Sequence, residues 1–481
     1  MFNLSLKSAY SFESSFTLFQ SFQVLLILSE KIVCYFGSWT IYRPGLGKFD
    51  ISDLDPRLCT HIIYSFVGIN TDGSLRVMDS WADLPSGLDG YGKFARLRQL
   101  SPGTKAMIAI GGWNEGSTKF SQVAGDPGTR ARFVQNVVNF LKQYNFDGFD
   151  VDWEYPNQRG GQPSDKENYV ALLRELRQAF NPQGYLLSVA VAAAESSASK
   201  SYNIGEVSKH VHFINLMAYD FNGSWNPKTG FNAPMYASSR ESGDQAKLNM
   251  VRMGAPSDKL VLGVPSYGRS FTLADPGNNG VGAPSTGPGA AGPYTQEAGM
   301  LGFNEICVDL GQGGWTVIGD PQQQVIYYES ESQKLNAGSH VILFIFRCVR
   351  KKADYINKMG LAGAMLWSVE TDDFRGTCGQ KYPLLNALNS VLRGGVPPPP
   401  ANPDPSNPSP APTAAPPPPP PPSASVCKEE GYARDPNDCS TFYYCKNVND
   451  QYQASTFHCA PGLAFDTSIN VCNYKESVPG C

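Results

Sequence analysis

Eight short apolar runs recur along most of this 481-residue chain, and helical periodicity fills several of the intervals between them. The runs lie at residues 31–39, 61–69, 105–113, 147–154, 186–193, 213–220, 259–268 and 363–370. Helical patterns are clearest at 130–144 and 167–180. Strands that alternate with helices eight times predict an α/β fold, a (β/α)8 TIM barrel, whose functional residues lie at the C-terminal ends of the strands.

The fourth run reads DGFDVDWE at residues 147–154 and places Asp150, Asp152 and Glu154 at a spacing of two. Because side chains alternate between the faces of a β-strand, these carboxylates share one face and the apolar residues share the other. An acidic strand face is costly to bury, so it rarely serves packing alone. The pattern therefore indicates a functional site.

Residues two apart in a strand have Cα atoms about 6.5 Å apart, so three partly desolvated carboxylates cannot all ionise. Their pKa values diverge, one proton is shared, and one acid stays protonated near neutral pH. Glu154 is the candidate general acid because it is nearest the C-terminal end of the run. The alternative interpretation of these carboxylates is a calcium site or a solvated turn. The flanking aromatic residues and the strand period of two fit neither.

Composition divides the chain into four parts. Residues 396–426 are dominated by proline and predict a semi-rigid linker between a barrel at 31–395 and a cysteine-rich module at 427–481. The interval before the last barrel strand is long enough for an inserted α+β subdomain at about 269–350. Residues 1–30 contain an apolar stretch at 16–28 that is too short to span a bilayer and is interpreted as a degraded signal segment.

Charge and cysteine content limit the function classes. A net charge of −4 with 17% charged residues provides no basic surface for nucleic acid. The five histidines form no cluster with metal-ligand spacing, and glycine motifs for phosphate binding are missing, so neither a metal nor an organic cofactor is expected. Eleven cysteines favour an oxidising compartment, which predicts a secreted, extracellular protein. A monomer without a membrane anchor is expected.

Residues 147–154 resemble the catalytic strand of family 18 glycoside hydrolases, the chitinases. The resemblance implies a substrate-assisted reaction in which Glu154 protonates the glycosidic oxygen. It assigns to Asp152 the orientation of the substrate acetamido group, and to Asp150 the sharing of a proton with Asp152. It also implies an α+β insertion that forms one wall of the substrate cleft.

Further site residues follow from the same resemblance. Tyr219 would hydrogen-bond the acetamido oxygen, Met217 would pack beneath the sugar, and Asp220 would bind a sugar hydroxyl. Tyr267 and Arg269 would contact substrate, although Arg269 could equally form a structural ion pair. Four tryptophans at strand ends would stack on successive sugar rings, Trp367 and Trp39 in minus subsites and Trp113 and Trp225 in plus subsites.

The six cysteines at 427–481 predict a three-disulfide scaffold, for which the sequence alone leaves 15 pairings open. Their spacing resembles the peritrophin-type chitin-binding module. The resemblance implies the pairs Cys427–Cys445, Cys439–Cys481 and Cys459–Cys472 in the module, and Cys34–Cys59 and Cys307–Cys378 in the barrel. Cys348 is outside these pairs.

Residues 325–350 depart from the family pattern, and they include the apolar run 339–348. The departure is interpreted as a sequence or splicing artefact or as a divergent cleft wall. An exposed run of this kind would promote aggregation.

The leading hypothesis is a secreted endo-chitinase that retains anomeric configuration and acts on N-acetylglucosamine polymers. The alternatives are a chitinase-like lectin without hydrolysis and a structural chitin-binding protein. The residue at the acid position discriminates between them, because a lectin would have replaced Glu154 and a structural protein would not need the acidic strand.

Overall fold

The computed structural model describes most of the chain in two parts, one N-terminal and one C-terminal. The described residues are 31–236, 242–275, 277–313, 315–320, 325–330, 339–343, 346–393, 427, 429–448, 451–459, 463–467, 471–475 and 478–481. The predicted signal segment 1–30 and the predicted linker 396–426 lie outside them. None of the described helices is both long and apolar enough to cross a bilayer.

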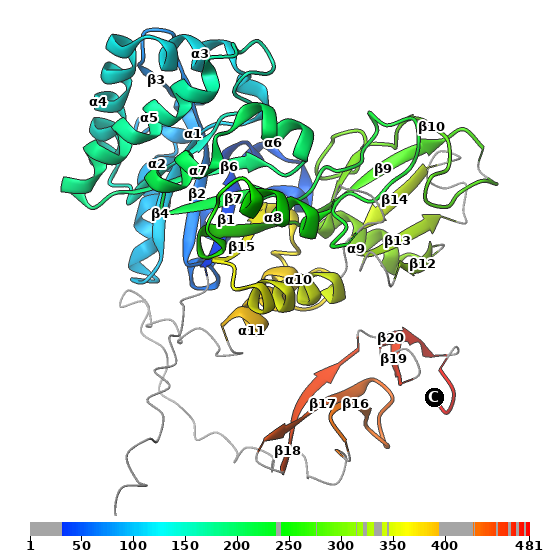
Figure 1. Ribbon diagram of the computed structural model, residues 1–481. Helices are drawn as coiled ribbons and strands as arrows, with labels where there is room; N and C mark the ends of the chain where they lie inside the picture. The colour runs from blue at the N-terminus through cyan, green and yellow to red at the C-terminus, as the bar shows by residue number, and fades with distance from the viewer. Residues whose placement is uncertain are drawn as a thin grey trace, which may run out of the picture.

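Eight parallel strands close into a barrel (Figure 1), which confirms the predicted fold. They are β1 (Lys31–Gly37), β2 (His61–Ile69), β4 (Lys105–Gly111), β5 (Gly148–Asp152), β6 (Leu186–Ala192), β7 (Phe213–Met217), β8 (Leu260–Pro265) and β15 (Gly363–Trp367). Closure occurs where β1 pairs in parallel with both β2 and β15. A short strand, β3 (Leu75–Arg76), continues antiparallel from β2.

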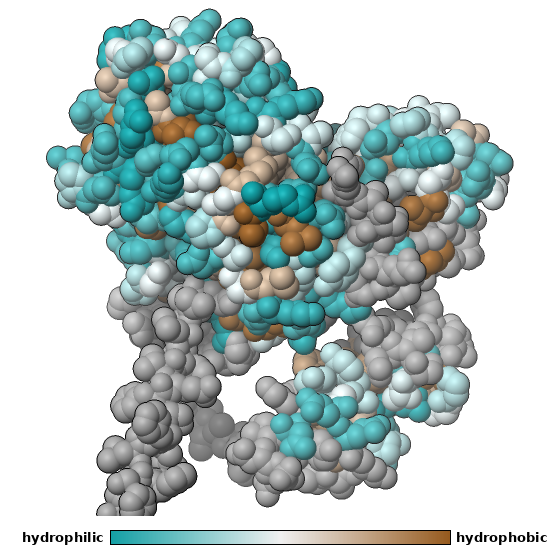
Figure 2. Space-filling view, in the orientation of Figure 1, coloured by the Kyte–Doolittle hydropathy of each residue, from teal (hydrophilic) through white to brown (hydrophobic). Residues whose placement is uncertain are grey.

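Helices cover the outside of the barrel, and on the face shown in Figure 2 the surface over them is largely hydrophilic. They are α1 (Ser80–Asp83), α2 (Gly90–Arg96), α3 (Thr118–Gly125), α4 (Pro127–Tyr144), α5 (Asp165–Phe180), α6 (Glu195–Ser201), α7 (Ile204–His210), α8 (Gly243–Arg252), α10 (Phe346–Met359) and α11 (Pro383–Leu392). The Asp126 carboxylate accepts the Thr129 backbone N–H at 2.7 Å and caps α4, and Asn145 ends that helix in the left-handed conformation.

The core has two layers. Apolar side chains of alternating strand positions fill the barrel interior, among them Val33, Ile63, Met107 and Phe213. The opposite strand faces pack against the helices. Alternation along each strand thus separates an outer apolar layer from an inner layer that leads to the barrel mouth.

Several predicted runs overshoot the strands. The run 259–268 is two strands, because Ser266 turns away from β8: its N–H donates to Trp367 O at 3.0 Å and its hydroxyl to Ser368 O at 2.6 Å. The run 213–220 ends as a strand at Met217, since Asp220 adopts a left-handed conformation with φ of 56°. Glu154 likewise lies past the end of β5, which stops at Asp152.

The insertion is a six-stranded antiparallel sheet in which β9 pairs with β10, β11 and β14. Its elements are β9 (Tyr267–Leu273), β10 (Ser285–Pro288), β11 (Met300–Gly302), α9 (Phe303–Gly311), β12 (Trp315–Asp320), β13 (Val325–Ser330) and β14 (Ser339–Leu343). The divergent residues 339–343 form β14, which is paired along both edges, by β9 and β13. The backbone edges of residues 339–343, the part of the apolar run that forms this strand, are therefore paired within the sheet.

The C-terminal part consists of a three-stranded sheet, β16 (Gly431–Arg434), β17 (Thr441–Val448) and β18 (Gln451–His458), and a hairpin, β19 (Leu463–Asp466) and β20 (Val471–Tyr474). Disulfides join Cys427 to Cys445 and Cys439 to Cys481. Cys459 is also disulfide-bonded. The side chain of Cys472, its expected partner, lies outside those described.

The barrel part contains the disulfides Cys34–Cys59 and Cys307–Cys378, the two pairs that the resemblance implies. The second closes a separation of 71 residues and links α9 to the segment after β15. Cys307 is half-buried and Cys378 is exposed, so neither contributes much to the core.

Replacing both Cys307 and Cys378 with Ala should therefore lower the free energy of unfolding by about 2–4 kcal/mol, mainly through the unfolded state. Calorimetric unfolding of the variant and wild type would measure this loss. In excess reductant the two proteins should unfold at the same temperature. A difference that persists there would assign the effect to the side chains instead of the crosslink.

Candidate active site

The acidic pattern lies at the mouth of the barrel and is almost entirely buried, with exposed fractions of 0% for Asp150, 4% for Asp152 and 9% for Glu154. Asp150 accepts hydrogen bonds from the Tyr35 hydroxyl at 2.7 Å, the Ser188 hydroxyl at 2.6 Å and the Asn215 amide at 3.3 Å. These donors come from β1, β6 and β7. Burial raises the pKa of Asp150 to about 6, although the three donors oppose this shift.

Asp152 has less support. Its Oδ1 atom is buried and has no hydrogen-bond partner among the described residues. Burial raises the pKa of Asp152 well above its ordinary value, and the neighbouring charges of Glu154 and Asp150 raise it further. A carboxyl group in this position binds a proton or meets a donor that the free protein does not supply.

Burial also raises the pKa of Glu154, to about 7. A hydrogen bond with Tyr155 and the cationic Arg159 oppose the shift, while Asp220 adds to it. Glu154 therefore carries a proton over much of the acidic and neutral range, as a general acid requires.

Tyr219 and Asp220 follow β7 and reach the same mouth. The Tyr219 hydroxyl lies 3.7 Å from Met365 Sδ, and Met217, Tyr219 and Trp367 all pack against the inner barrel layer. The Asp220 backbone N–H donates to the Asn232 side-chain oxygen at 2.9 Å, which holds the left-handed turn.

Arg269 forms the ion pair that the sequence left as an alternative to substrate contact. Its Nε and Nη2 donate to Asp220 at 2.8 and 2.7 Å, and the Tyr267 hydroxyl donates to the same carboxylate at 2.8 Å. Tyr267 and Arg269 belong to β9, so the insertion is joined to the barrel loop at the mouth. The Arg269 guanidinium also lies 5.1 Å from the centroid of the Trp225 ring.

Aromatic rings surround the acidic residues. Trp367 contacts Tyr35, Trp39 and Phe66 with ring centroids 5.5, 6.4 and 5.9 Å apart. Trp39, Trp113 and Trp225 keep 44%, 59% and 57% of their surfaces exposed. The exposed faces are suited to stacking on sugar rings.

Sequence reasoning missed five residues that the structure brings to this mouth: Tyr35, Phe66, Arg159, Ser188 and Asn215. Tyr35 and Asn215 are separated from Asp150 by 115 and 65 residues. Their one signal was their place within predicted strands, on the face that points into a barrel. Arg159 lies in a loop and carried no signal.

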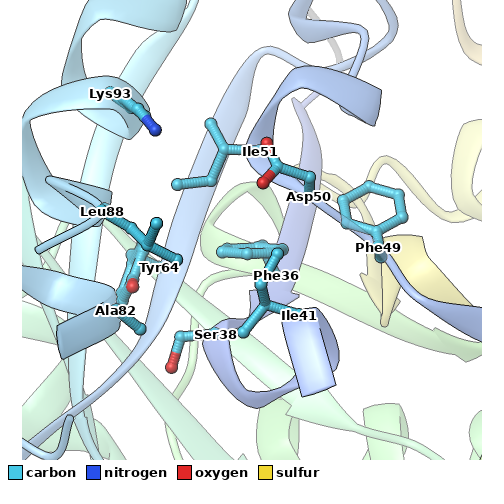
Figure 3. Close-up of a pocket in the computed structure, with 11 residues that line it drawn as sticks. Phe36, Ser38, Ile41, Phe49, Asp50, Ile51, Tyr64, Ala82, Leu88 and Lys93 are labelled. Atoms are coloured by element: carbon cyan, nitrogen blue, oxygen red, sulfur yellow. The ribbon is translucent and has the colours of Figure 1, made fainter. Parts of the chain in front are cut away.

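Other candidate sites are weaker. A small pocket between β1, β2 and the α1–α2 segment is lined mostly by apolar side chains such as Phe36 and Ile51, with Asp50 and Lys93 beside them (Figure 3). Asp50 already accepts the Ser52 N–H at 3.0 Å. Cys307, Asp373 and Cys378 are the one metal-type cluster among the described residues, but the two cysteines form a disulfide.

The C-terminal sheet presents an aromatic face. Phe442 lies between Phe457 and Phe465, with ring centroids 5.4 and 4.0 Å away, and Tyr432 lies 5.0 Å from Tyr444. Tyr432 and Phe457 are 38% and 37% exposed. The side chains of Tyr443 and Cys445 point to the opposite, buried face, as strand alternation requires.

The Glu154→Gln variant should be more stable than wild type at alkaline pH. The folded pKa of about 7 exceeds the ordinary value of 4.5, so the stability contributed by this proton is greatest below about pH 4 and is lost as pH rises to about 7. The variant lacks that loss, and its advantage should grow by up to about 3 kcal/mol between acidic and alkaline pH.

Chemical unfolding at several pH values would measure this difference. Glu167→Gln, at an exposed position of α5, is the matched control and should track wild type. A pH-independent difference between the Glu154 variant and wild type would contradict the prediction.

Comparison with known proteins agrees with this geometry. Residues 31–372 match the model of glycosyl hydrolases family 18, and residues 427–481 match the chitin binding Peritrophin-A domain. The chain is 39% identical to Probable chitinase 2 of Drosophila melanogaster, over 75% of this chain and 80% of the relative. It is 38% identical to Endochitinase of Manduca sexta, over 77% of this chain and 69% of the relative.

Among solved structures, the Ostrinia furnacalis Group IV chitinase in complex with allosamidin is similar with a TM-score of 0.73 and 42% identity, covering 76% of this chain and 100% of that chain. Both resemblances drawn from the sequence are thereby confirmed. The chain belongs to family 18 of the glycosyl hydrolases and carries a C-terminal Peritrophin-A chitin-binding domain.

Proposed function

We propose that this family 18 endo-chitinase cleaves the β-1,4 bonds of N-acetylglucosamine polymers with Glu154 as general acid and the substrate acetamido group as nucleophile. Glu154 gives its proton to the glycosidic oxygen while the acetamido carbonyl oxygen attacks the anomeric carbon. The glycosidic C–O bond breaks and an oxazolinium ion remains. Water, deprotonated by Glu154, then opens this ion from the opposite face, so the configuration is retained overall.

The observation that carries this proposal is the buried, proton-sharing carboxylate series. The pKa of Glu154 is raised to about 7, so this acid is protonated before the reaction. The buried Oδ1 atom of Asp152 has no hydrogen-bond donor among the described residues. The acetamido N–H of a bound sugar is such a donor. Its hydrogen bond would orient the attacking carbonyl and stabilise the positive charge of the oxazolinium ion. Asp150 would exchange a proton with Asp152 during this step, and Tyr219 would donate to the acetamido oxygen.

The aromatic residues divide the substrate surface in two. Trp367 and Trp39, whose ring centroids are 6.4 Å apart, would carry sugars on the non-reducing side of the cleaved bond. Trp113 and Trp225 would carry the leaving sugars. The remaining substrate contacts would come from Met217, Tyr267, Asp220 and Arg269. The Asp220–Arg269 ion pair would also form hydrogen bonds with sugar hydroxyls.

The C-terminal domain binds chitin, and we propose that its aromatic face is the binding surface. Residues 396–426 would tether it to the barrel and so keep the enzyme concentrated at an insoluble polymer. Secretion as a monomer suits such a substrate and agrees with the disulfides in both described parts.

A chitinase-like lectin is the second candidate, since the tryptophans and the C-terminal domain would bind chitin without turnover. The retained Glu154, Asp152 and Tyr219 favour hydrolysis, because a lectin has no use for a protonated acid at the barrel mouth.

Wild-type protein should release dimers to tetramers from the N-acetylglucosamine hexamer, and Glu154→Gln should lower kcat by about 10³-fold because the amide cannot protonate the leaving oxygen. Mass spectrometry of the products provides the measurement, with Glu167→Gln as the active control. Equal turnover by Glu154→Gln would remove Glu154 from its role. Binding without turnover by every protein would establish a lectin.

The pH profile of kcat/KM should fall as pH rises through about 7, since deprotonation of Glu154 removes the acid. Initial rates on the hexamer across a buffered pH series would locate this limb. A profile that stays flat to strongly alkaline pH would contradict the assignment of the raised pKa to the catalytic acid.

Replacing Tyr432 and Phe457 with Ala should weaken adsorption to insoluble chitin by about tenfold, because two exposed stacking surfaces are lost. Pull-down isotherms on chitin beads would measure adsorption. Hydrolysis of the soluble hexamer should not change. Unchanged adsorption would place the binding surface elsewhere in the domain.

A further inference from the structure

Arg159 touches both the proposed acid residue and a proposed leaving-side platform. Its Nη1 donates to the backbone carbonyl of Trp113 at 2.7 Å and to that of Glu154 at 2.9 Å. The Cζ atom of the same guanidinium lies 3.5 Å from the centroid of the Trp113 ring. One side chain therefore joins two loops that follow neighbouring strands, β4 and β5.

The two loops are also joined by hydrogen bonds that do not involve Trp113. Trp153 Nε1 donates to the Ser117 hydroxyl at 2.9 Å, and that hydroxyl donates to Tyr155 O at 2.7 Å. The Ser117 backbone N–H donates to Arg159 O at 3.3 Å. These bonds position the loop backbones, but they do not reach the indole.

The Trp113 ring has a close contact with the Arg159 guanidinium, whose Cζ atom lies 3.5 Å from the ring centroid. Its other ring contact is an edge contact with Tyr155, with centroids 6.5 Å apart, and the residue is 59% exposed. A guanidinium this close to the ring centroid occupies one face of the indole, and the exposure of Trp113 leaves surface for a sugar. An exposed indole without such support would lose rotamer freedom each time it bound substrate.

We propose that Arg159 is a positioning residue that holds Trp113 as a one-sided stacking platform at a fixed register from Glu154. The leaving sugar would rest on the open face of the indole while its glycosidic oxygen meets the acid. The planar guanidinium can stack on the ring while its Nη1 bonds both carbonyls, whereas a Lys ammonium has no planar face to stack, so Lys cannot replace Arg here. This inference rests on the proposed function and adds to it the residue that sets leaving-side binding.

The charge of Arg159 has a second, separable effect. It lowers the pKa of Glu154 against the effect of burial. The other titratable groups that act on Glu154 or feel its charge are Asp152, Tyr155, Tyr202, Tyr219 and Asp220. Arg159 is positively charged, whereas the groups just named are carboxylic acids and tyrosines. Removing Arg159 should therefore raise the pKa of Glu154 and move the alkaline limb of activity to higher pH.

Two variants separate stacking from charge. Arg159→Met keeps a side chain of comparable bulk without charge or donors, and Arg159→Lys keeps the charge without the planar fork. Arg96→Met is the control, because Arg96 is exposed and pairs with Asp89 away from the mouth. The substrates are the N-acetylglucosamine hexamer and β-chitobiosyl fluoride, which presents no sugar to Trp113 because fluoride is its leaving group.

For Arg159→Met, kcat/KM on the hexamer should fall about tenfold, mainly through KM, while that on the fluoride stays within about twofold. The alkaline limb should move to higher pH. Arg159→Lys should show the same hexamer loss with the limb of wild type, and Arg96→Met should match wild type throughout. Equal losses on both substrates, or no loss on either, would overturn the proposal.

A binding measurement tests Arg159 independently of turnover. In Glu154→Gln protein, the hexamer Kd from tryptophan fluorescence should rise about tenfold when Arg159→Met is added. An unchanged Kd would overturn the positioning role. Wild type that fails to hydrolyse the hexamer would count against the proposed function, and the binding result would still decide the role of Arg159.

Discussion

Desolvation of the carboxylates at the barrel mouth is the constraint on which the chemistry of this protein depends. Removal from water disfavours the ionised form of each acid, and Asp150, Asp152 and Glu154 follow one another within five residues. Three hydrogen-bond donors from three other strands offset the cost of burying the Asp150 carboxylate. Asp152 has no comparable support at Oδ1, so the series must share protons. Burial raises the pKa of the neighbouring Glu154 to about 7, so this acid stays protonated close to neutral pH.

The parallel barrel makes such a series possible. Because all eight strands point the same way, their C-terminal ends meet in one ring, and side chains far apart in the chain become neighbours there. The β1 and β15 ends supply the Trp39 and Trp367 rings, and the loop after β7 supplies Asp220. The insertion sheet adds Arg269 and Tyr267 from its first strand. The same ring that buries the acids therefore also carries the aromatic surfaces.

Arginines recur beside the two tryptophans that are proposed to bind the leaving sugars. Arg159 covers one face of Trp113, and Arg269 lies near Trp225 while it holds Asp220. Each tryptophan is more than half exposed, and the guanidinium carbons lie 3.5 and 5.1 Å from the two ring centroids. Rigid platforms reduce the entropy lost when a polymer binds, which matters most where the substrate is long and weakly held at each ring.

Much of the fold and of the candidate site could be predicted from short-range sequence patterns. The spacing of two in residues 147–154 depends only on strand geometry, and it singled out Glu154 as the candidate acid and indicated the family. The alternation of apolar runs predicted the barrel class, and cysteine content predicted a disulfide-stabilised protein. Strand ends were less well predicted, since Ser266 leaves the barrel through bonds to Trp367 and Ser368, about a hundred residues away.

The tertiary structure alone decided which side chains meet the acids. The Tyr35–Asp150 bond spans 115 residues, and the Phe66–Trp367 contact joins the second strand to the last. It also showed that Arg269 bonds Asp220, and it placed Arg159 on Trp113. A sequence records the period of each element, but the partners of a side chain depend on how distant elements are brought together, and that is determined by the closed packing of the whole barrel.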